Sequence, residues 1–340
     1  MPASDPPRAT LADVAALAGV SPSTASRVLT HRGEFGDDTR ARVLAAAASL
    51  GYDRSTTARG RTAGSSVRLI ELVLGEFGSS WSDHVVAGAR REAFARGYDL
   101  VLTQERDDPA DDWPARVAAR RSSGVVLALI TPTRGQLQMF AGFSVPTVLL
   151  DPRSDSSGGL VSIGATNERG GADAAAHLLD SGYERFAIAT SALRYRFGRA
   201  RERGFRDELA RRRPGVEIDS IEADWDGAVP APGLAAALRR ARGARLGVFA
   251  TNDAIARTLC AAMLAAGRRV PDDVGVVGFD DDEPAAGAVP LTTVRQPVEQ
   301  MAATAVRTID DLRRGLPAPT GPVELPTELV VRDSTGPARI

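Results

Sequence analysis

The sequence predicts a small all-α head followed by an α/β region of two doubly wound lobes. Residues 10–50 carry short helical patterns with a glycine between the first two, and from Val67 onward apolar runs of strand length alternate with helical stretches. The chain has 340 residues, more than one ordinary core holds at roughly 150 residues per domain. We therefore expect two or three compact units.

The first helix of the head is expected to begin at Leu11. Thr10 and Asp13 form a capping-box pattern, in which each side chain accepts from the other residue's backbone N–H. Gly19 ends this helix, because glycine reaches the left-handed conformation of a tight exit without steric cost. The head therefore opens with a short capped helix and a sharp turn.

A second helix follows the turn. Ser21 is its expected N-cap and Pro22 its first residue, where the missing N–H of proline costs nothing. Ala25, Val28 and Leu29 face inward at helical spacing. The outward face then carries short donors and acceptors and one guanidinium, on Ser23, Thr24, Ser26 and Arg27. This is the chemistry of a recognition helix that reads bases in a major groove.

A third helix is expected over 38–50, with its inward face formed by Val43, Leu44, Ala47 and Leu50. Three such helices form a domain of roughly 50 residues, small enough to depend on a partner for rigidity. The layout is that of a helix-turn-helix and predicts binding to double-stranded DNA. An alanine-rich helix pair of purely structural role has the same spacing, so spacing alone leaves both interpretations open.

The residue identities in the head are more specific than the spacing of its apolar positions. Residues 10–29, with Thr39, Arg40 and 50–52, resemble the DNA-binding signature of the lactose repressor and galactose repressor family of bacterial transcription factors. The resemblance implies that the second helix reads operator DNA and that flanking residues contact it. The expected DNA-binding residues of the head are Thr10, Ser21, Pro22, Ser23, Thr24, Ser26, Arg27, His31, Thr39, Arg40 and Tyr52.

Residues 53–66 are rich in Arg, Ser, Thr and Gly and predict a linker. In the resembling family this segment is a hinge that folds on operator DNA and opens the minor groove with a leucine. Ala58 and Arg59 fit that pattern, but Arg61 stands where the leucine is expected, and an arginine does not unstack a base step as an apolar wedge does. We expect either a hinge that does not kink DNA in the usual way or a tether whose arginines contact phosphates.

The charge and the cysteine content limit the classes of protein to which the chain can belong. The net charge is −1, so attraction to nucleic acid must be local, and residues 1–61 carry a slight excess of arginine over acid. The chain has no lysine, and arginine suits phosphate and guanine contacts. The single cysteine, Cys260, excludes an intrachain disulfide and predicts a buried helix position among apolar neighbours. An apolar leader and a bilayer-spanning run are both lacking, which predicts a cytoplasmic protein.

Strand and helix signals alternate after the linker. Strands are expected at 68–74, 99–103, 124–130, 147–150, 186–190, 246–250 and 274–279. Helices are expected at 84–96, 170–181, 200–211, 234–242 and 254–266. This alternation fits two doubly wound parallel sheets, whose ligands bind at the carboxyl ends of the strands.

The resemblance extends over the loops of this region, at 146–151, 182–183, 201–205, 251–254, 271–275, 277–281 and 291–297. It implies the periplasmic-binding-protein-like fold, two similar lobes joined by three crossovers near residues 165, 292 and 323. The expected organisation is a head at 1–52, a linker at 53–66, an effector-binding and dimerisation domain at 67–331 and a tail at 332–340. Lobe 1 then spans about 67–164 and 295–322, and lobe 2 about 165–292 and 323–331.

Polar side chains expected in the cleft suit a ligand with many hydroxyl groups. Arg201 matches the family's effector-binding arginine and forks onto adjacent hydroxyls, unless it belongs to a solvated helix face. Asp280 follows a strand and accepts hydroxyl hydrogens, or else caps a turn in an acidic run. Asn252 donates and accepts, and it also suits the N-cap of the helix that follows.

Aromatic side chains complete the expected ligand site. Trp225, Phe77 and Trp81 offer faces on which the apolar side of a sugar stacks, although aromatic residues are more often part of a core. Asp151 ends a strand and either lines the cleft or takes part in signalling. These residues favour a saccharide over a purine as the effector.

Catalytic signatures are missing from the sequence. It has no G-x-S-x-G, Walker, G-x-G-x-x-G or H-E-x-x-H motif, and its three histidines are scattered. We therefore expect no enzyme activity, no metal and no cofactor. The main alternative is a regulator that binds its operator without any small-molecule effector. A sugar-binding receptor and a doubly wound enzyme are minor alternatives.

The expected assembly is a homodimer on a roughly palindromic operator, with a saccharide as effector and no membrane partner. Each recognition helix would occupy one half-site. The tail 332–340 lacks the leucine heptads that tetramerise the lactose repressor, which favours a dimer. Repression is the default that the family resemblance implies.

Overall fold

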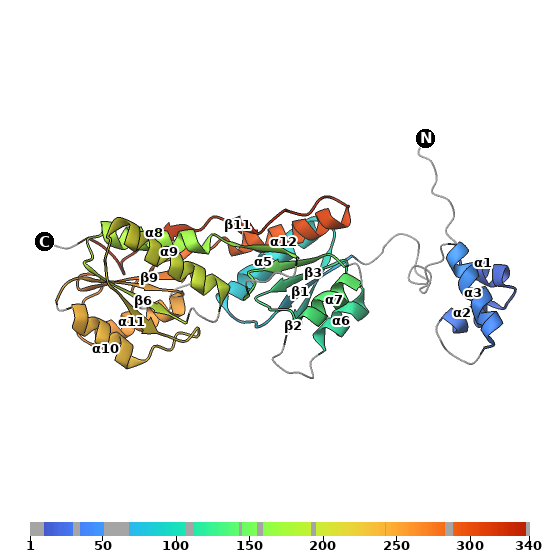
Figure 1. The fold of residues 1–340 in the computed structure, drawn as a ribbon, viewed down its shortest axis with the longest axis horizontal. Helices are drawn as coiled ribbons and strands as arrows, with labels where there is room; N and C mark the ends of the chain where they lie inside the picture. The colour runs from blue at the N-terminus through green and yellow to red at the C-terminus, as the bar shows by residue number, and fades with distance from the viewer. Residues whose placement is uncertain are drawn as a thin grey trace. The chain divides into compact units, whose positions relative to one another are not determined.

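The structure is a computed structural model that describes residues 10–29, 35–50, 68–105, 112–142, 145–154, 159–191, 195–241, 243–282 and 288–337. The chain divides into two compact units, Met1–Ser66 and Val67–Ile340 (Figure 1). Several expected DNA contacts lie outside the described residues, together with the linker 53–66: His31, Tyr52, Ala58, Arg59 and Arg61.

The head consists of α1 (Leu11–Ala18), α2 (Pro22–Leu29) and α3 (Asp37–Ser49). The predicted capping box is confirmed, because Thr10 N donates to Asp13 Oδ2 at 2.7 Å and Asp13 N donates to Thr10 Oγ1 at 3.3 Å. Gly19 ends α1 with a φ of 64°, also as predicted. One apolar cluster joins the helices and contains Val14, Ala15, Ala18, Ala25, Val28, Val43, Ala46 and Ala47.

The inward face of α3 differs from the predicted one. Val43, Ala46 and Ala47 are buried, whereas Leu44 and Leu50 are exposed. Successive residues of a helix are roughly 100° apart, so burial of Val43 turns Leu44 toward solvent. The prediction that both leucines face inward is therefore wrong.

Lobe 1 is built on a parallel sheet whose described strands run in the order β11-β5-β4-β3-β1-β2. The strands are β1 (Leu69–Leu74), β2 (Asp99–Gln104), β3 (Gly124–Ala128), β4 (Thr147–Leu150), β5 (Val161–Ala165) and β11 (Val323–Leu325). The central strands are near-continuous apolar runs because both faces of the sheet are covered.

Lobe 2 repeats this plan, with described strands in the order β12-β10-β9-β8-β6-β7. The strands are β6 (Arg185–Thr190), β7 (Ile218–Glu222), β8 (Leu246–Ala250), β9 (Val274–Asp280), β10 (Thr292–Arg295) and β12 (Glu328–Val330). Only the β10–β12 pairing is antiparallel among the described strands of this sheet.

Helices cover both faces of each sheet (Figure 1). In lobe 1, α5 (Ser80–Ala95) and α12 (Val298–Arg313) pack on one face, and α6 (Trp113–Arg120) and α7 (Arg134–Gly142) lie on the other. In lobe 2, α8 (Asn167–Asp180) and α9 (Arg196–Arg212) pack on one face, and α10 (Ala231–Ala241) and α11 (Asp253–Ala265) on the other. Cys260 is buried on α11, as predicted.

The chain crosses between the lobes at Thr166, at 296–297 and at 326–327, after strands β5, β10 and β11 respectively. Residues 292–295 and 323–325 are short strands that the sequence prediction did not include, the first between β12 and β9 in the lobe 2 sheet and the second at the edge of the lobe 1 sheet. Because β11 pairs with β5, residues 323–325 belong to lobe 1, which corrects their expected place in lobe 2. The first and third crossovers touch, since Thr166 Oγ1 and Thr327 Oγ1 are 3.1 Å apart.

Residues 332–336 are bound to lobe 2, although the sequence predicts a tail at 332–340 beyond the lobes. Ser334 Oγ donates to Val276 O at 2.6 Å, and Thr335 Oγ1 lies 2.7 Å from His177 Nε2. Arg245 Nη2 donates to Gly336 O at 2.6 Å. These bonds make the segment a structural part of the lobe.

Helices α8 and α9 cross in close contact. A Cβ atom at Gly204 would lie 1.8 Å from Glu168 O, and one at Gly171 would lie 2.0 Å from Arg201 O. Real side chains do not reach such distances, so both positions require glycine at this crossing. The crossing therefore sets the depth at which the side chains of α9 enter the lobe.

Replacing Gly204 with Ala is expected to lower the free energy of unfolding by about 3 kcal/mol, because the added methyl group pushes two helix backbones apart. The control is Gly135→Ala on α7, where an added Cβ meets nothing within 4 Å. That variant should be neutral or slightly more stable, since alanine has the higher helix propensity. Denaturant unfolding checks both, and equal midpoints for the two variants would contradict the expectation.

Candidate functional site

The exposed surface of α2 carries the polar residues that the sequence placed there. Ser21 Oγ accepts from Thr24 N at 3.1 Å and therefore caps the helix, as predicted. The Arg27 guanidinium lies 5.5 Å from the centre of the Phe35 ring. The remaining expected contacts of the head are exposed or half-buried: Thr10, Pro22, Ser23, Ser26, Thr39 and Arg40. Hydroxyls and a guanidinium on one short helix suit base edges and phosphates.

Arg201 is the centre of a polar cluster at the carboxyl ends of the lobe 2 strands. Its side chain is only 1% exposed, so it does not lie on a solvated helix face. Nε donates to Asn167 Oδ1 at 2.8 Å, and Nη1 donates to Thr251 O at 2.7 Å and to Asp280 Oδ1 at 3.2 Å. The guanidinium also lies 3.7 Å from the centre of the Phe279 ring. Contacts from α8, β8 and β9 therefore hold one positive charge in the interior.

Asp280 and Asp281 follow each other in strained backbone conformations. Their φ angles are 118° and 62°, in the region that favours glycine. Gln296 Nε2 donates to Asp280 Oδ1 at 2.6 Å. Arg295 Nε and Arg332 Nη2 donate to the Asp281 carboxylate at 2.7 and 2.6 Å. Residues on the second crossover and beyond β12 thus hold the strained pair in place.

The carboxyl groups around Arg201 keep their protons to unusually high pH. Burial raises the pKa of Asp280 to about 7 and that of Asp151 to about 6, although the charge of Arg201 lowers both. Burial, together with the charge of Asp280, raises the pKa of Asp253 to about 8, although a hydrogen bond from Thr293 lowers it. Burial is the largest cause for each of the three acids and outweighs the nearby positive charges of Arg201, Arg196 and Arg257.

Aromatic rings stand beside the guanidinium. The Tyr195 and Phe197 rings stack with centroids 5.3 Å apart, and Trp225 meets them edge-on at 5.4 and 5.1 Å. The Arg201 guanidinium is 5.8 Å from the centre of the Trp225 ring and 5.4 Å from that of Phe197. Sequence reasoning selected Trp225 and missed the other two rings. Their position just before or at the start of the helix that carries Arg201 was the available signal.

Buried polar atoms near this cluster lack partners. Thr190 Oγ1 and Ser191 Oγ at the end of β6, and Gln296 Oε1 on the second crossover, have no hydrogen-bond partner among the residues that the structure describes. The end of β6 adjoins Thr251, whose N donates to Ala189 O at 3.0 Å. An unsatisfied buried hydroxyl costs about 1–3 kcal/mol, so such atoms need an explanation. A ligand with hydroxyl groups would supply the missing bonds.

The other residues expected in the site have different surroundings. Asn252 accepts from Ile255 N at 2.8 Å as the N-cap of α11 and donates to Trp225 O at 2.8 Å, so it positions that tryptophan. Trp81 packs against the apolar core of lobe 1, and Phe77 is 41% exposed. The core role that was the alternative for Trp81 is the one that the structure gives it.

The lobes touch beside the cluster. Asp151 ends β4 of lobe 1, and the charges of Arg201 and Arg196 of lobe 2 both act on it. Arg196 N donates to Arg153 O at 2.9 Å, and the Arg153 guanidinium lies 5.7 Å from the centre of the Tyr195 ring. Strand ends of both lobes therefore surround the same polar region.

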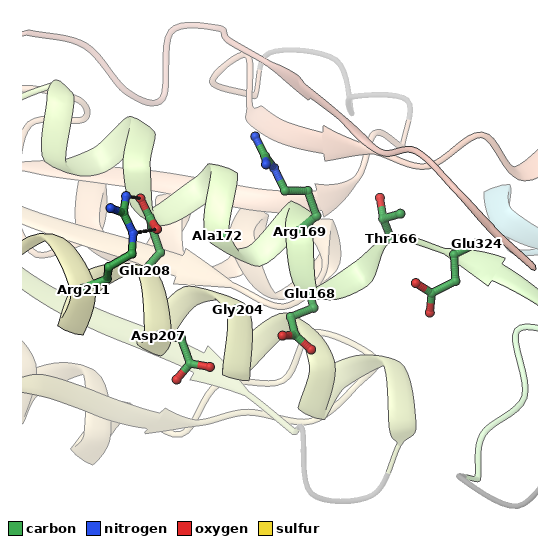
Figure 2. Close-up of a pocket in the computed structure, with 9 residues that line it drawn as sticks. All are labelled: Thr166, Glu168, Arg169, Ala172, Gly204, Asp207, Glu208, Arg211 and Glu324. Atoms are coloured by element: carbon green, nitrogen blue, oxygen red, sulfur yellow. Dashed lines mark hydrogen bonds and ion pairs between the residues drawn. The ribbon is translucent and has the colours of Figure 1, made fainter. Parts of the chain in front are cut away.

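Two grooves lie near or outside this region. One of about 490 Å³ runs between α5 and the start of α12 and reaches Asp280 and Gln296. Another of about 480 Å³ lies on the outer surface of α8 and α9, where Figure 2 shows Arg211 paired with Glu208. The second groove shares no residue with the Arg201 cluster.

Two further properties concern metal binding and membrane spanning. In the described ranges, no group of three His, Cys, Asp or Glu side chains is placed to hold a metal ion. Within the same ranges, every helix is too short or too polar to cross a membrane.

Comparisons with known proteins agree with both units of the chain. Residues 10–55 match the family of bacterial regulatory proteins named lacI, and residues 175–335 match the periplasmic binding protein-like domain. The HTH-type transcriptional regulator DegA of Bacillus subtilis is 30% identical over 97% of this chain and 99% of its own length. The chain belongs to the lacI family of bacterial regulatory proteins.

Solved structures resemble this lacI-family chain over nearly its whole length. The transcriptional regulator CelR in complex with cellobiose is 28% identical, with a TM-score of 0.69 over 96% of this chain and 100% of that one. The Lac repressor dimer bound to operator and the anti-inducer ONPF is 27% identical, with a TM-score of 0.69 over 97% of this chain and 100% of that one. These matches confirm the predicted family and fold class. The lacI-family chain is a transcriptional regulator and not an enzyme.

Replacing Asp253 with Asn is expected to flatten the pH dependence of stability. The pKa of Asp253 is about 8 in the folded chain, above its unfolded value of about 4, so the folded chain keeps a proton that the unfolded chain releases. The free energy of unfolding contributed by this group therefore falls as pH rises from about 4 to about 8. Thermal unfolding of both proteins at several pH values in that window measures the difference.

The control for this measurement is Glu217→Gln, whose side chain is exposed on lobe 2. Its unfolding temperature should differ from that of the wild type by a constant amount. The Asp253→Asn variant should instead gain stability relative to the wild type as pH rises. Parallel curves for wild type and Asp253→Asn would refute the role given to this buried acid.

Proposed function

We propose that this chain is a ligand-responsive repressor that binds operator DNA as a homodimer and changes its operator affinity when a saccharide binds between its lobes. The observation that carries the proposal is the buried Arg201 cluster with unpaired polar atoms beside it, in a chain that also has a helix-turn-helix head. Such a regulator acts on chromosomal DNA, so the proposed place of action is the cytoplasm.

The DNA end of the proposal rests on α2. Its exposed polar face carries Ser23 and Arg27, and its N-cap is satisfied by its own serine. Short hydroxyls and one guanidinium allow base-edge and phosphate contacts in a major groove. The similar Lac repressor is a dimer bound to operator, which supports a dimer with one recognition helix in each half-site.

The effector end rests on the chemistry around Arg201. Asp280 and Asp151 accept hydroxyl hydrogens, while the hydroxyls of Thr190 and Ser191 donate or accept. The Trp225 ring, held by Asn252 and flanked by Tyr195 and Phe197, offers a wall for the apolar side of a sugar ring. CelR, which is similar in fold, was solved with cellobiose, and this supports a saccharide.

Coupling between effector binding and DNA binding is expected to act through the crossovers. Gln296 donates to Asp280, and Arg295 and Arg332 donate to Asp281. A ligand that contacts Asp280 therefore also acts on the segments that join the lobes. A saccharide that binds one lobe arrangement more tightly shifts the population toward it. The operator affinity of the dimer then changes by that differential affinity.

The decisive experiment combines DNA and ligand. Purified protein is incubated with genomic fragments from around its own gene, and the bound fragment is titrated again with mono- and disaccharides and purines. Selective binding relieved or strengthened by one saccharide supports the proposal. Selective binding that is indifferent to every compound favours the alternative of a regulator without an effector.

Replacing Arg27 with Ala is expected to weaken binding to the recovered fragment by about 1–3 kcal/mol, roughly 10- to 100-fold, because a groove contact is lost. Ligand binding by the lobes should not change. The control is Arg42→Ala on α3, which removes an exposed pair with Asp38. Fluorescence anisotropy with labelled duplex measures both, and equal losses for the two variants would count against the recognition role of α2.

Replacing Asp280 with Asn is expected to raise the saccharide concentration needed for half-maximal response at least about tenfold, since an amide NH2 replaces one of the two acceptor oxygens. The amide is isosteric, so binding to the fragment without saccharide should persist. Asp207→Asn, in the outer groove on α9, is the matched control and should respond like the wild type. An unchanged response of Asp280→Asn would remove Asp280 from the ligand site.

A further inference from the structure

Arginine side chains gather around one buried carboxylate at the base of lobe 1. Asp310 on α12 is 1% exposed and accepts from Tyr98 Oη at 2.7 Å and from Arg96 Nη1 at 2.7 Å. Arg314 Nη2 lies 2.8 Å from Asp310 Oδ2, the oxygen that Arg96 also contacts, and Arg68 Nη2 lies 3.3 Å from Asp310 Oδ1. Arg313 Nη1 donates to Tyr98 Oη at 3.0 Å. We name Arg68, Arg96, Arg313 and Arg314 the basal arginine cluster.

The Asp310 carboxylate keeps this cluster in place. Burial raises its pKa, but hydrogen bonds from Tyr98 and Arg96 and the charge of Arg314 outweigh burial and hold the pKa below its usual value. Asp310 is therefore ionised at neutral pH. The Arg68 guanidinium is stacked 4.0 Å from the centre of the Tyr98 ring. The guanidiniums are thus positioned before any partner arrives.

Positive charge exceeds negative charge in this network. Besides Asp310, the carboxylate bound to the cluster among the described residues is Glu92, which Arg96 Nε contacts at 2.7 Å and which also accepts from Arg307. Arg68 and Arg314 have side chains that are 39% and 61% exposed, and Arg313 is exposed. A guanidinium has five N–H donors in a planar fork, so these side chains keep donors that face water. Such forks suit phosphate oxygens.

The location of the cluster indicates which kind of partner it binds. Arg68 precedes β1 and Arg96 precedes β2, so both lie at the amino ends of parallel strands of lobe 1. The proposed ligand site lies at the carboxyl ends of strands, away from this cluster. Arg68 is also the first described residue after the linker, so the chain that carries the DNA-reading head joins the lobe at this cluster. This covalent tether raises the effective concentration of any DNA bound by the head.

We propose that the basal arginine cluster binds backbone phosphates of the duplex that flanks the bases read by the head, an inference that rests on the proposed operator binding. Asp310 and Tyr98 then hold the arginine side chains of the cluster in position. The contact adds affinity and salt dependence without adding sequence preference. Because the cluster and the ligand site lie at opposite edges of the sheet, the two do not compete for one surface.

The test measures salt dependence. The double variant Arg313→Ala/Arg314→Ala is titrated with the genomic duplex recovered by the wild type and with a scrambled duplex of the same length, across a range of salt concentrations. The slope of log affinity against log salt is expected to decrease by about 1 for each lost phosphate contact, on both duplexes. Trimming one helical turn of flanking duplex should remove the difference between variant and wild type.

Two further variants separate charge from structure. Arg313→Lys/Arg314→Lys keeps the charge and should keep most of the wild-type slope. Arg169→Ala/Arg211→Ala removes two arginines of lobe 2 that are 73% and 69% exposed and should leave the slope unchanged. Thermal unfolding verifies that each variant is folded, and Asp310 retains Tyr98, Arg68 and Arg96 when Arg314 is absent.

The outcomes are distinct. A wild-type protein that selects no duplex overturns the proposed function and this inference with it. A wild type that selects a duplex, together with an alanine pair of unchanged slope, overturns only the phosphate-binding role of the cluster. Equal losses of slope in the lobe 1 and lobe 2 alanine pairs overturn it as well, because the effect is then one of net charge.

Discussion

One buried guanidinium determines much of lobe 2. A charge in a protein interior is tolerated only when it is paired and fully hydrogen-bonded. Arg201 meets this condition through Asn167, Thr251 and Asp280, contributed by α8, β8 and β9. The glycines at the α8–α9 crossing bring α9 close enough for that side chain to reach them. The polar character of the region around Arg201, with its proton-retaining acids, follows from the need to surround this charge.

The strain at the end of β9 has a related origin. Aspartates with positive φ persist only where their surroundings over-determine them. Here the side chain of Asp280 is held by Arg201 and Gln296, and Asp281 is held by Arg295 and Arg332. Gln296, on the second crossover, therefore helps to maintain an unfavourable backbone conformation in lobe 2.

Capping and turn signals in the head predict local structure correctly, whereas the inward face of α3 and the pairing of short distant strands are not predicted. Thr10 with Asp13, and Gly19, specify a helix and its exit within a few residues, so the structure agrees with the prediction. The short strands β10, β11 and β12 lack a visible period because pairing with distant strands defines them. Gln296 escaped notice for the same reason, since only the fold brings it to Asp280. Trp81 packs against the core of lobe 1, and the sequence leaves this role open because burial in a core and stacking on a ligand favour the same residue type.

The interleaving of the chain also decides when each part is complete during synthesis. The head is a compact unit within the first 66 residues and emerges first. Lobe 1 waits for α12 and β11, and lobe 2 waits for β10, β12 and the fastened segment 332–336. Both lobes therefore finish almost together, when the segment 292–336 has left the ribosome. A product cut short before that segment keeps the head and loses the edge strands β11 and β12 and the core helix α12 of its lobes.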